Sequence, residues 1–433
     1  MKIDYTKFNN EELNIAMGLI RRIKSYGYEA YAVGGCVRDM VRYYIKQTDS
    51  ANIHDIDIAT NMPIPELQDK FHTESNNGEK HGTILVLIDK HAFEVTQFRT
   101  DGDYTDGRHP DSVKFAKTFK EDAARRDFTI NAMGMDCDGK VIDYYGGIDD
   151  IQNKKIRAVG KADDRFKEDA LRMLRAIRFS TVFGYGIEAF TWGAILDNAE
   201  LIGKVSCERI RKEILSATEK ASHYMSSFFE ALMNTTLTNH IKAFVPIASF
   251  GPDHRLPDLI YNMNRVTIRN IDYGDVELNT SNVIPFICAS LGFRISAMEA
   301  LVATREEFKM LNFYGNSLSY INNTKPEEYK WSKLVEIAEG DYHMVLDVLS
   351  SIKYPAYLYE KMNIARFLSQ NKPDMKALSD KVKEMGIPQG KEYGKKLAEL
   401  VENAYAEKAK MLTTTISITV GNSIVNYKLV SVD

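Results

Sequence analysis

The first 150 residues of the chain mix two hydrophobic periods. Apolar side chains recur every three or four positions from about Asn10 to Ser25, which predicts an amphipathic helix. Residues 36–45 show the same spacing directly after the pair Gly34-Gly35. Short β-branched or alternating runs predict four strands, at residues 28–33, 54–60, 83–89 and 92–99. Short strands interleaved with helices predict an α/β fold for this region.

The character of the chain changes after Gly147. From residue 162 to about residue 411 the apolar positions keep a helical spacing, prolines are few and the breaks are short and polar. This part is therefore predicted to be mostly helical. The last residues alternate around Gly421-Asn422 and predict two strands. Asp138-Gly139 predicts a hairpin in the earlier α/β region.

Composition narrows the class of protein. The 433 residues are 44% hydrophobic, which is ordinary for a soluble protein of several domains, and no run approaches the ~18 uninterrupted apolar residues of a membrane span. The N-terminus has acidic residues where a secretion signal would be apolar. The four cysteines are scattered without CxxC spacing. We therefore expect reduced thiols, no zinc site, no membrane partner and a cytoplasmic location.

Charge is segregated along the chain. The formal net charge is −4, yet residues 154–178 contain nine Lys or Arg and four acidic residues. Attraction to phosphates acts locally and is screened within ~10 Å, so a basic segment can bind RNA in a protein that is acidic overall. A solvated helix face is the alternative interpretation of this segment.

Two short motifs bring candidate chemistry to the α/β region. Gly34-Gly35 lies between a predicted strand and a predicted helix, where glycine lets backbone N–H groups approach a triphosphate, and Arg38 follows one turn later. Asp55 and Asp57 are two positions apart in a predicted strand, so their carboxylates share one face. Adjacent carboxylates repel one another unless a cation lies between them, and Mg²⁺ takes oxygen ligands. The alternative is a turn followed by an exposed, alternating strand.

Further acidic and basic residues extend the candidate site. Glu94 interrupts an apolar strand, which indicates either a third metal ligand or a structural salt bridge. In Arg125-Arg126-Asp127 the acid can orient the guanidinium groups toward phosphate and ribose, and a structural ion pair is the alternative.

Residues 165–179 are predicted to form one helix. Three-residue spacing places a polar stripe beside an apolar one, and the polar stripe consists of Asp169, Arg172, Arg175 and Arg178. Asp169 accepts hydrogen bonds and Arg172 donates them, so the pair can read the edge of a base, while the two later arginines can reach phosphates. A helix that satisfies its own charges through ion pairs is the alternative.

The order of these motifs resembles the nucleotidyltransferase superfamily, and within it the bacterial-type (class II) tRNA CCA-adding enzymes and the bacterial poly(A) polymerases. The resemblance is specific over about residues 28–180 and softer at 206–215 and 386–397. It implies that Asp55 and Asp57 hold two Mg²⁺ ions, one activating the primer 3′-hydroxyl and one carrying the triphosphate. The nucleotide-binding residues that it implies are Gly34, Gly35, Arg38, Arg126, Asp127, Asp169, Arg172, Arg175 and Arg178.

Two more segments acquire roles through the same resemblance. Residues 103–110 resemble the loop that in the family steers the change from adding C to adding A, which implies a flexible loop containing Asp106, Arg108 and His109. His109 stands where the family has a second arginine, and imidazole is mostly neutral above pH ~6.5. Residues 165–179 resemble the EDxxR motif, which serves the family as a protein template for the incoming base.

We therefore expect an α/β nucleotidyltransferase head followed by all-α neck, body and tail domains. The expected boundaries are 1–150 for the catalytic head, 151–225 for a neck that templates the base and binds RNA, 226–370 for the body and 371–433 for a tRNA-binding tail with a short β-like end. The expected reaction adds CCA to the 3′ end of tRNA from CTP and ATP without a nucleic-acid template, with the tRNA bound through its acceptor and T arms. The alternatives are a poly(A) polymerase, an enzyme that adds only A and, in a different class, an inactive RNA-binding scaffold. The sequence does not specify an oligomeric state.

Overall fold

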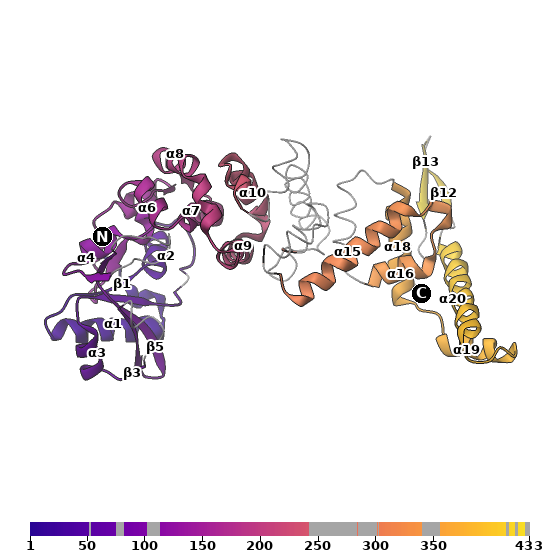
Figure 1. Ribbon diagram of the computed structural model, residues 1–433, viewed down its shortest axis with the longest axis horizontal. Helices are drawn as coiled ribbons and strands as arrows, with labels where there is room; N and C mark the ends of the chain where they lie inside the picture. Colours follow the sequence, from indigo (N-terminus) through magenta and orange to yellow (C-terminus); the bar gives the residue numbers. More distant parts are fainter. Residues whose placement is uncertain are drawn as a thin grey trace. The chain divides into compact units, whose positions relative to one another are not determined.

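The computed structural model of the chain describes residues 1–51, 53–74, 82–101, 113–241, 284, 301, 303–339, 356–412, 415–420 and 423–428. Residues up to 241 belong to one compact unit and residues from 303 onward to a second (Figure 1). The predicted loop residues Asp106, Arg108 and His109 lie outside the described residues. No helix that the structure describes is both long and apolar enough to cross a membrane.

A seven-stranded sheet organises the first unit. Its strand order is β3-β4-β5-β2-β1-β8-β9, and each neighbouring pair is antiparallel except β2 with β5. Its members are β1 (Ala30–Val33), β2 (Asp57–Thr60), β3 (Thr73–Glu74), β4 (Thr83–Ile88), β5 (His91–Gln97), β8 (Met133–Met135) and β9 (Val141–Asp143). Two-stranded pairs are formed by β6 (Arg99–Asp101) with β7 (Val113–Phe115) and by β10 (Lys155–Ile156) with β11 (Gly186–Ile187).

The predicted strands and hairpin are confirmed, with shorter bounds at 54–60. The hairpin joins β8 to β9, and Gly139 takes the left-handed φ of +76° that its turn requires. Helices α1 (Glu11–Ser25) and α2 (Gly35–Tyr44) pack against β1. Tyr31 of β1 instead joins an aromatic cluster, in which its ring centroid lies 5.0 Å from that of the first residue of α4 (Phe119–Ala124).

The rest of the first unit is mainly helical. Its helices are α5 (Gly147–Gln152), α6 (Ala162–Glu168), α7 (Leu171–Phe183), α8 (Ala189–Asp197), α9 (Cys207–Ala221) and α10 (Met225–Asn234). Helix α7 packs against both α9 and α10. It buries Leu171, Leu174 and Ile177, which is the apolar stripe that the sequence predicted.

The prediction of one helix over residues 165–179 is wrong. The chain breaks between α6 and α7 at Asp169, whose backbone is extended with φ −148° and ψ 102°. The Oδ1 atom of Asp169 accepts a hydrogen bond from the N–H of Leu171 at 3.1 Å. This side chain therefore satisfies a backbone donor in the first turn of α7 rather than lying on the same helix as Arg172.

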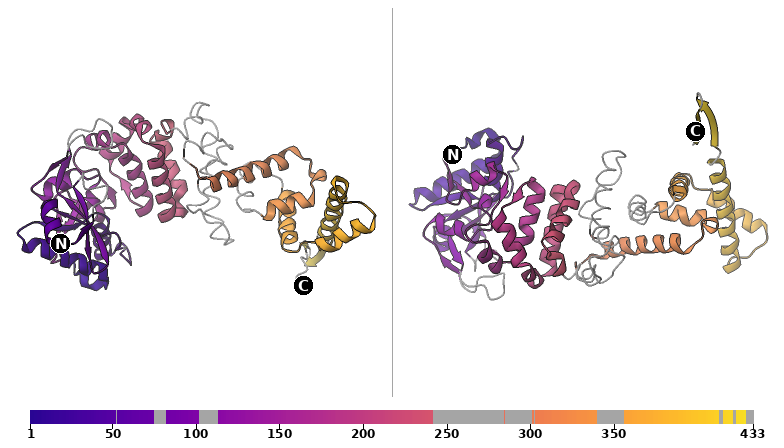
Figure 2. Two further views of the ribbon diagram at one scale, coloured as in Figure 1. Left: turned by 60° about the horizontal axis from the view of Figure 1, so that its bottom comes forward. Right: turned by 90° about the horizontal axis from the view of Figure 1, so that it is seen from above.

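The described part of the second unit is built from helices and one hairpin (Figure 2). Its helices are α15 (Arg305–Asn323), α16 (Trp331–Glu339), α18 (Ala356–Gln370), α19 (Met375–Glu384) and α20 (Lys391–Leu412). Helix α20 packs against α16 and α18, and its Glu402 accepts backbone hydrogen bonds from Trp331 and Ser332 at 2.5 and 3.0 Å. The predicted C-terminal strands are confirmed as the antiparallel pair β12 (Thr415–Val420) and β13 (Ser423–Lys428).

Candidate functional site

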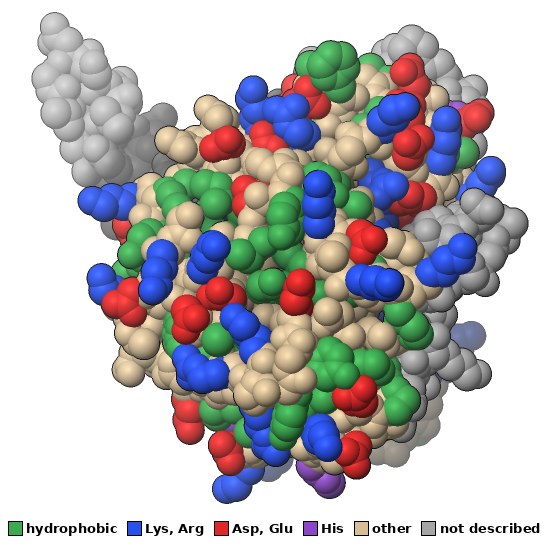
Figure 3. Space-filling model, turned by 90° about the vertical axis from the view of Figure 1, so that its left-hand side faces the viewer, with side chains coloured by type: hydrophobic (Ala, Val, Ile, Leu, Met, Phe, Trp, Pro, Cys, Tyr) green, Lys and Arg blue, Asp and Glu red, His purple; other side chains and the backbone are tan. Residues whose placement is uncertain are grey.

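A polar cleft of about 510 Å³ opens in the first unit. Seven basic and three acidic side chains line it, so the cleft is positively charged in a chain that is acidic overall. On the face of this unit shown in Figure 3, by contrast, Lys and Arg are interspersed with Asp and Glu. Ten predicted site residues line the cleft: Gly34, Gly35, Arg38, Asp57, Arg126, Asp127, Asp169, Arg172, Arg175 and Arg178. The lining also includes Arg125, which belongs to the predicted arginine pair, and Asn131, Phe179 and Lys220, which were not predicted as site residues.

The glycine turn, Asp57 and Arg126 come together at one place in the cleft. Gly34 has φ +77° and ψ −137°, a conformation that residues with a side chain rarely adopt. A Cβ atom at Gly34 would lie 3.7 Å from Oδ2 of Asp57 and 3.9 Å from Nη1 of Arg126. Strands β1 and β2 place Val33 opposite Asp57, which brings the carboxylate next to the start of α2. The turn therefore joins free backbone N–H groups, a carboxylate and a guanidinium.

Asp57 and Glu94 lie beside one another on neighbouring strands. Parallel pairing places Ile58 opposite Val95, so the residue before each of them falls on the same face of the sheet. The pKa of Asp57 is raised to about 6, first because the carboxylate loses hydration in the cleft and then because Glu94 is negatively charged. Arg126 opposes this shift, and Asp55 adds to it. A divalent cation relieves repulsion of this kind.

The prediction that Asp55 and Asp57 share one strand is only partly right. Strand β2 begins at Asp57, and Asp55 lies in the preceding turn with φ +51°. Ile56 and Ile58 are nevertheless 3% and 0% exposed, so the predicted alternation holds and both carboxylates are exposed. Within the described ranges, no three acidic, His or Cys side chains are placed so that together they could hold a metal ion, so Asp55, Asp57 and Glu94 do not form a three-ligand set. An open set of oxygen donors fits Mg²⁺, which keeps several waters and takes few protein carboxylates.

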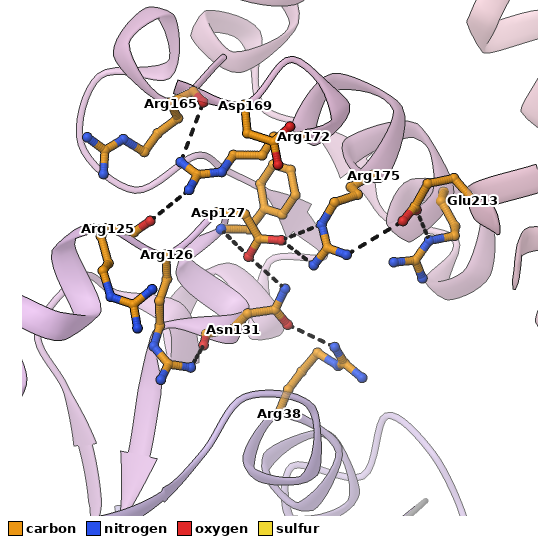
Figure 4. Close-up of polar contacts among 12 residues, drawn as sticks. Arg38, Arg125, Arg126, Asp127, Asn131, Arg165, Asp169, Arg172, Arg175 and Glu213 are labelled. Atoms are coloured by element: carbon orange, nitrogen blue, oxygen red, sulfur yellow. Dashed lines mark hydrogen bonds and ion pairs between the residues drawn. The ribbon is translucent and has the colours of Figure 1, made fainter. Parts of the chain in front are cut away.

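A relay of hydrogen bonds crosses the cleft from α2 to α7 (Figure 4). Two nitrogens of Arg38 donate to the carboxylate of Asp39, each at 2.9 Å, and a third donates to Oδ1 of Asn131 at 2.8 Å. Asn131 donates in turn to Oδ1 of Asp127 at 3.1 Å. Oδ2 of Asp127 accepts two hydrogen bonds from Arg175, at 2.9 and 2.6 Å. The relay therefore fixes guanidinium groups that come from two different helices.

The relay continues from α7 to α9 through Glu213. Its Oε1 lies 3.7 Å from Arg175, and its Oε2 accepts a hydrogen bond from Arg178 at 2.5 Å. Arg178 is only 6% exposed, so it is a largely buried part of the cleft wall. Burial would raise the pKa of Asp127, but the charge and hydrogen bonds of Arg175, together with Asn131, outweigh it and lower this pKa to about 2.

The prediction that Asp127 orients the neighbouring arginines is wrong, because Asp122 holds them instead. One oxygen of Asp122 accepts from Arg125 at 3.0 and 2.9 Å, and the other accepts from Arg126 at 3.4 and 3.1 Å. Asp122 is fully buried, which would raise its pKa, but the two guanidinium groups hold that pKa below its usual value. Its spacing of three and four residues before the arginines was a signal that could have identified it.

The predicted base-reading pair faces the cleft with part of its hydrogen-bonding capacity already used. Oδ2 of Asp169 accepts from Arg209 of α9 at 2.7 Å. Arg172 donates to Glu168 at 2.7 Å and to the backbone oxygen of Arg125 at 3.1 Å. Both side chains are therefore held in one orientation by neighbours that the sequence did not identify.

Residues 30–157 match the family model described as the poly(A) polymerase head domain. These residues are therefore similar to the head domain of that family. The expected α/β nucleotidyltransferase head is therefore confirmed, and the glycine turn, Asp57, Glu94 and the relay residues up to Asn131 all lie within the matched region.

The chain is similar to curated relatives over only part of their length. The chain is 42% identical to a CCA-adding enzyme of Lactobacillus johnsonii over 245 residues. This matched region covers 55% of this chain and 58% of that protein. It is 46% identical over 199 residues to a CCA-adding enzyme of Geobacillus kaustophilus, covering 46% and 48%. The chain thus spans about half the length of the curated relatives that it matches.

Solved structures resemble the chain beyond the nucleotidyltransferase head. The Bacillus stearothermophilus CCA-adding enzyme in complex with CTP has a TM-score of 0.62 and 27% identity, over 93% of this chain and 98% of that one. The Thermotoga maritima CCA-adding enzyme complexed with tRNA has a TM-score of 0.71 over 95% and 98%, and at 17% identity it supports the fold alone. The expected head followed by helical neck, body and tail is confirmed.

Proposed function

We propose that the chain adds CCA to the 3′ end of tRNA from CTP and ATP, without a nucleic-acid template. The observation that carries this proposal is one cleft that is lined by the glycine turn, by Asp57 and Asp169 and by seven basic residues, Arg172 among them. Support also comes from relatives named CCA-adding enzymes. The structural relative with bound CTP supports the nucleotide substrate.

The carboxylates and the glycine turn have different parts in the proposed reaction; of the three carboxylates, Asp57 lines the cleft. Asp55 and Asp57, with Glu94 as a third candidate, would hold two Mg²⁺ ions, which supply activation of the 3′-hydroxyl and charge neutralisation at the triphosphate. The glycine turn and the first N–H groups of α2 would receive the triphosphate, with Arg126 beside them. The primer 3′-oxygen bonds to the α-phosphorus, and pyrophosphate leaves.

Base selection would fall to the junction of α6 and α7. Asp169 accepts a hydrogen bond from the amino group of C or A, and Arg172 donates a hydrogen bond to a ring nitrogen or carbonyl of the base. Because Arg209 and Glu168 already hold these side chains, the base meets fixed hydrogen-bonding groups. Nucleotides that offer donors and acceptors in other places leave buried polar groups unpaired, which costs affinity.

The remaining parts would bind the RNA. In this proposal residues 1–150 are the catalytic head, 151–225 the neck, 226–370 the body and 371–433 the tail. The tRNA acceptor and T arms would lie on the helical domains, and the enzyme would act in the cytoplasm. The loop containing Asp106, Arg108 and His109 would govern the change from C to A.

The test uses three tRNA transcripts that end before CCA, after C and after CC. Each is incubated with Mg²⁺ and labelled CTP, ATP or both, and the products are sized. We expect completion to CCA and then termination. Long A tails would favour a poly(A) polymerase, addition of A to the CC transcript alone would favour an A-adding enzyme, and no incorporation would favour a scaffold.

A further inference from the structure

Two stacked aromatic rings pack against arginines that line the cleft. Phe179 and Phe183 are one turn apart on α7, with ring centroids 5.7 Å apart and planes within 7° of parallel. The guanidinium carbon of Arg178 lies 4.3 Å from the centroid of Phe179, and that of Arg175 lies 5.3 Å from it. Phe179 is 6% exposed and lines the cleft.

The second ring receives arginines from α2. The guanidinium carbon of Arg38 lies 4.7 Å from the centroid of Phe183 and 5.6 Å from that of Phe179. That of Arg42 lies 4.3 Å from Phe183. The two rings therefore connect α2, which starts at the glycine turn, with α7, which carries the base-reading arginine.

The rings and the carboxylates hold different parts of each guanidinium. Hydrogen bonds to Asp39, Asn131 and Asp127 run from the N–H edges of Arg38 and Arg175. The flat faces of a guanidinium are weakly hydrated and stack on aromatic rings, whose own faces are electronegative. The two rings therefore hold the guanidinium groups close together, although their like charges repel one another.

We propose that Phe179 and Phe183 are positioning residues, which hold Arg38 and Arg175 in the arrangement that receives the phosphates of the incoming nucleotide. This inference rests on the proposed function. The rings do not contact the reacting atoms in this account and act only through the arginines. Their loss weakens the binding of every nucleoside triphosphate equally, because phosphates carry no base information.

The experiment compares Phe183→Leu with Phe183→Trp in the full chain, since Phe183 is not one of the described residues that line the cleft. Leucine fills much of the space but has no ring face, whereas tryptophan keeps one. Equilibrium binding of CTP and of ATP is measured with Mg²⁺, together with the rate of single-nucleotide addition at saturating substrate. We expect the leucine variant to bind both nucleotides roughly 5- to 20-fold more weakly, with a saturating rate within about twofold of wild type. The tryptophan variant should bind within about twofold of wild type.

Phe71→Leu is the matched control. Phe71 also carries a guanidinium over its ring, since Arg22 lies 4.8 Å from its centroid, but it is not a lining residue of the cleft. This variant should bind nucleotides as wild type does. Phe183→Met provides the same comparison if the leucine variant does not fold, because methionine fills space without a ring.

Two results would overturn the positioning role while leaving the proposed function in place. One is unchanged binding in Phe183→Leu. The other is equal weakening in the leucine and tryptophan variants, which would indicate simple packing. A wild-type chain that binds neither CTP nor ATP would instead overturn the proposed function, so the two failures are distinguishable.

Discussion

The surroundings of Asp57 disfavour the ionised form of its carboxylate. Its pKa is about 6 in the folded chain, against 3.8 for an ordinary aspartate. The folded state therefore binds this proton more tightly than the unfolded state does. Ionisation of Asp57 thus lowers the free energy of unfolding as pH rises from about 4 to about 6, and the cost is fully present above pH 6.

Asp57→Asn should stabilise the protein while abolishing nucleotide addition. Without divalent ions at pH 8 we expect a melting temperature about 2–4 °C higher, which corresponds to ~1 kcal/mol once the partial exposure of the carboxylate is allowed for. The difference should vanish near pH 4, where the wild-type carboxylate is protonated. Thermal melts at the two pH values check this, and a variant that melts below wild type at pH 8 would contradict it. Activity should fall on the order of 10³-fold or more, and we expect the same loss in Asp55→Ala, because both carboxylates would position the metal ions.

Asp127 behaves in the opposite way. Its pKa of about 2 lies below the ordinary value of 3.8, so its ion pair contributes stability above pH 4 that is lost as pH falls toward 2. Asp127→Asn should lower the free energy of unfolding by ~2 kcal/mol at pH 7, with a smaller deficit at pH 3. Urea titrations at both pH values measure this. Asp164→Asn, an exposed acid of α6, is the control, and an equal loss in both variants would contradict the assignment.

Arg172→Ala should relax base choice. Arg172 faces the cleft while its neighbours hold it in place, so its removal takes away one donor from the base edge. We expect UTP or GTP to be added more readily relative to CTP and ATP, by roughly 5- to 150-fold. Single additions with each of the four nucleotides measure this, with Lys167→Ala as an exposed control. An unchanged preference order, with all rates equally reduced, would remove the templating role.

At the scale of elements, the spacing of hydrophobic positions along the sequence predicted most of the helices and strands. The break at Asp169 was missed because the segment contains neither glycine nor proline, although aspartate favours caps and turns over helix interiors and was a weak signal of it. The residue that binds its carboxylate, Arg209, is 40 positions away in sequence. Motif order therefore identified which residues gather in the cleft. It did not identify their partners, such as Arg175 for Asp127, because partner choice depends on how helices pack.

Helix α9 presents one face to the cleft. Arg209, Glu213 and Lys220 follow a helical spacing of four and seven. Arg209 forms an ion pair with Asp169, and Glu213 forms one with Arg178. Lys220 is exposed on this face and lines the cleft. We expect it to meet a phosphate of the RNA primer.

Lys220→Gln should weaken tRNA binding more than nucleotide binding. A single lost phosphate contact lowers the slope of log affinity against log salt by about 1, whatever the tRNA sequence. Filter binding across a salt series measures this, with KM for CTP determined in parallel. Lys212→Gln, exposed on the same helix but not in the cleft lining, is the control. A raised KM for CTP with unchanged tRNA binding would place Lys220 on the nucleotide instead.

At the scale of the whole molecule, the two units have separate hydrophobic cores. The first is centred on the seven-stranded sheet and α7, and the second is built where α16, α18 and α20 pack together. For the second unit the sequence predicted helices and, through the resemblance at 386–397, a tail that binds tRNA. It predicted no catalytic residue there, because the apolar spacing alone specifies no chemistry. Units with separate cores unfold as separate cooperative transitions unless their interface couples them.

Calorimetry of the full chain should therefore show two transitions. CTP with Mg²⁺ at about 100 times its dissociation constant should raise the transition of the first unit alone, through ~2.7 kcal/mol of binding free energy. Asp57→Ala should keep both transitions and lose most of the shift. A single transition that moves as a whole with CTP would show that the units unfold together.

The relay from Asp39 to Glu213 has a consequence for turnover. The guanidinium groups of the relay already bind carboxylates. An anion that enters the cleft must therefore replace a carboxylate as the hydrogen-bond partner, and the lost hydrogen bonds offset part of its binding free energy. The affinity for phosphates is correspondingly moderated, because the displaced carboxylates must find water or other donors. In the proposed reaction, the same carboxylates would bind the guanidinium groups again when pyrophosphate departs. Carboxylates that compete with the product for the same guanidinium groups favour its release, even from a strongly basic cleft.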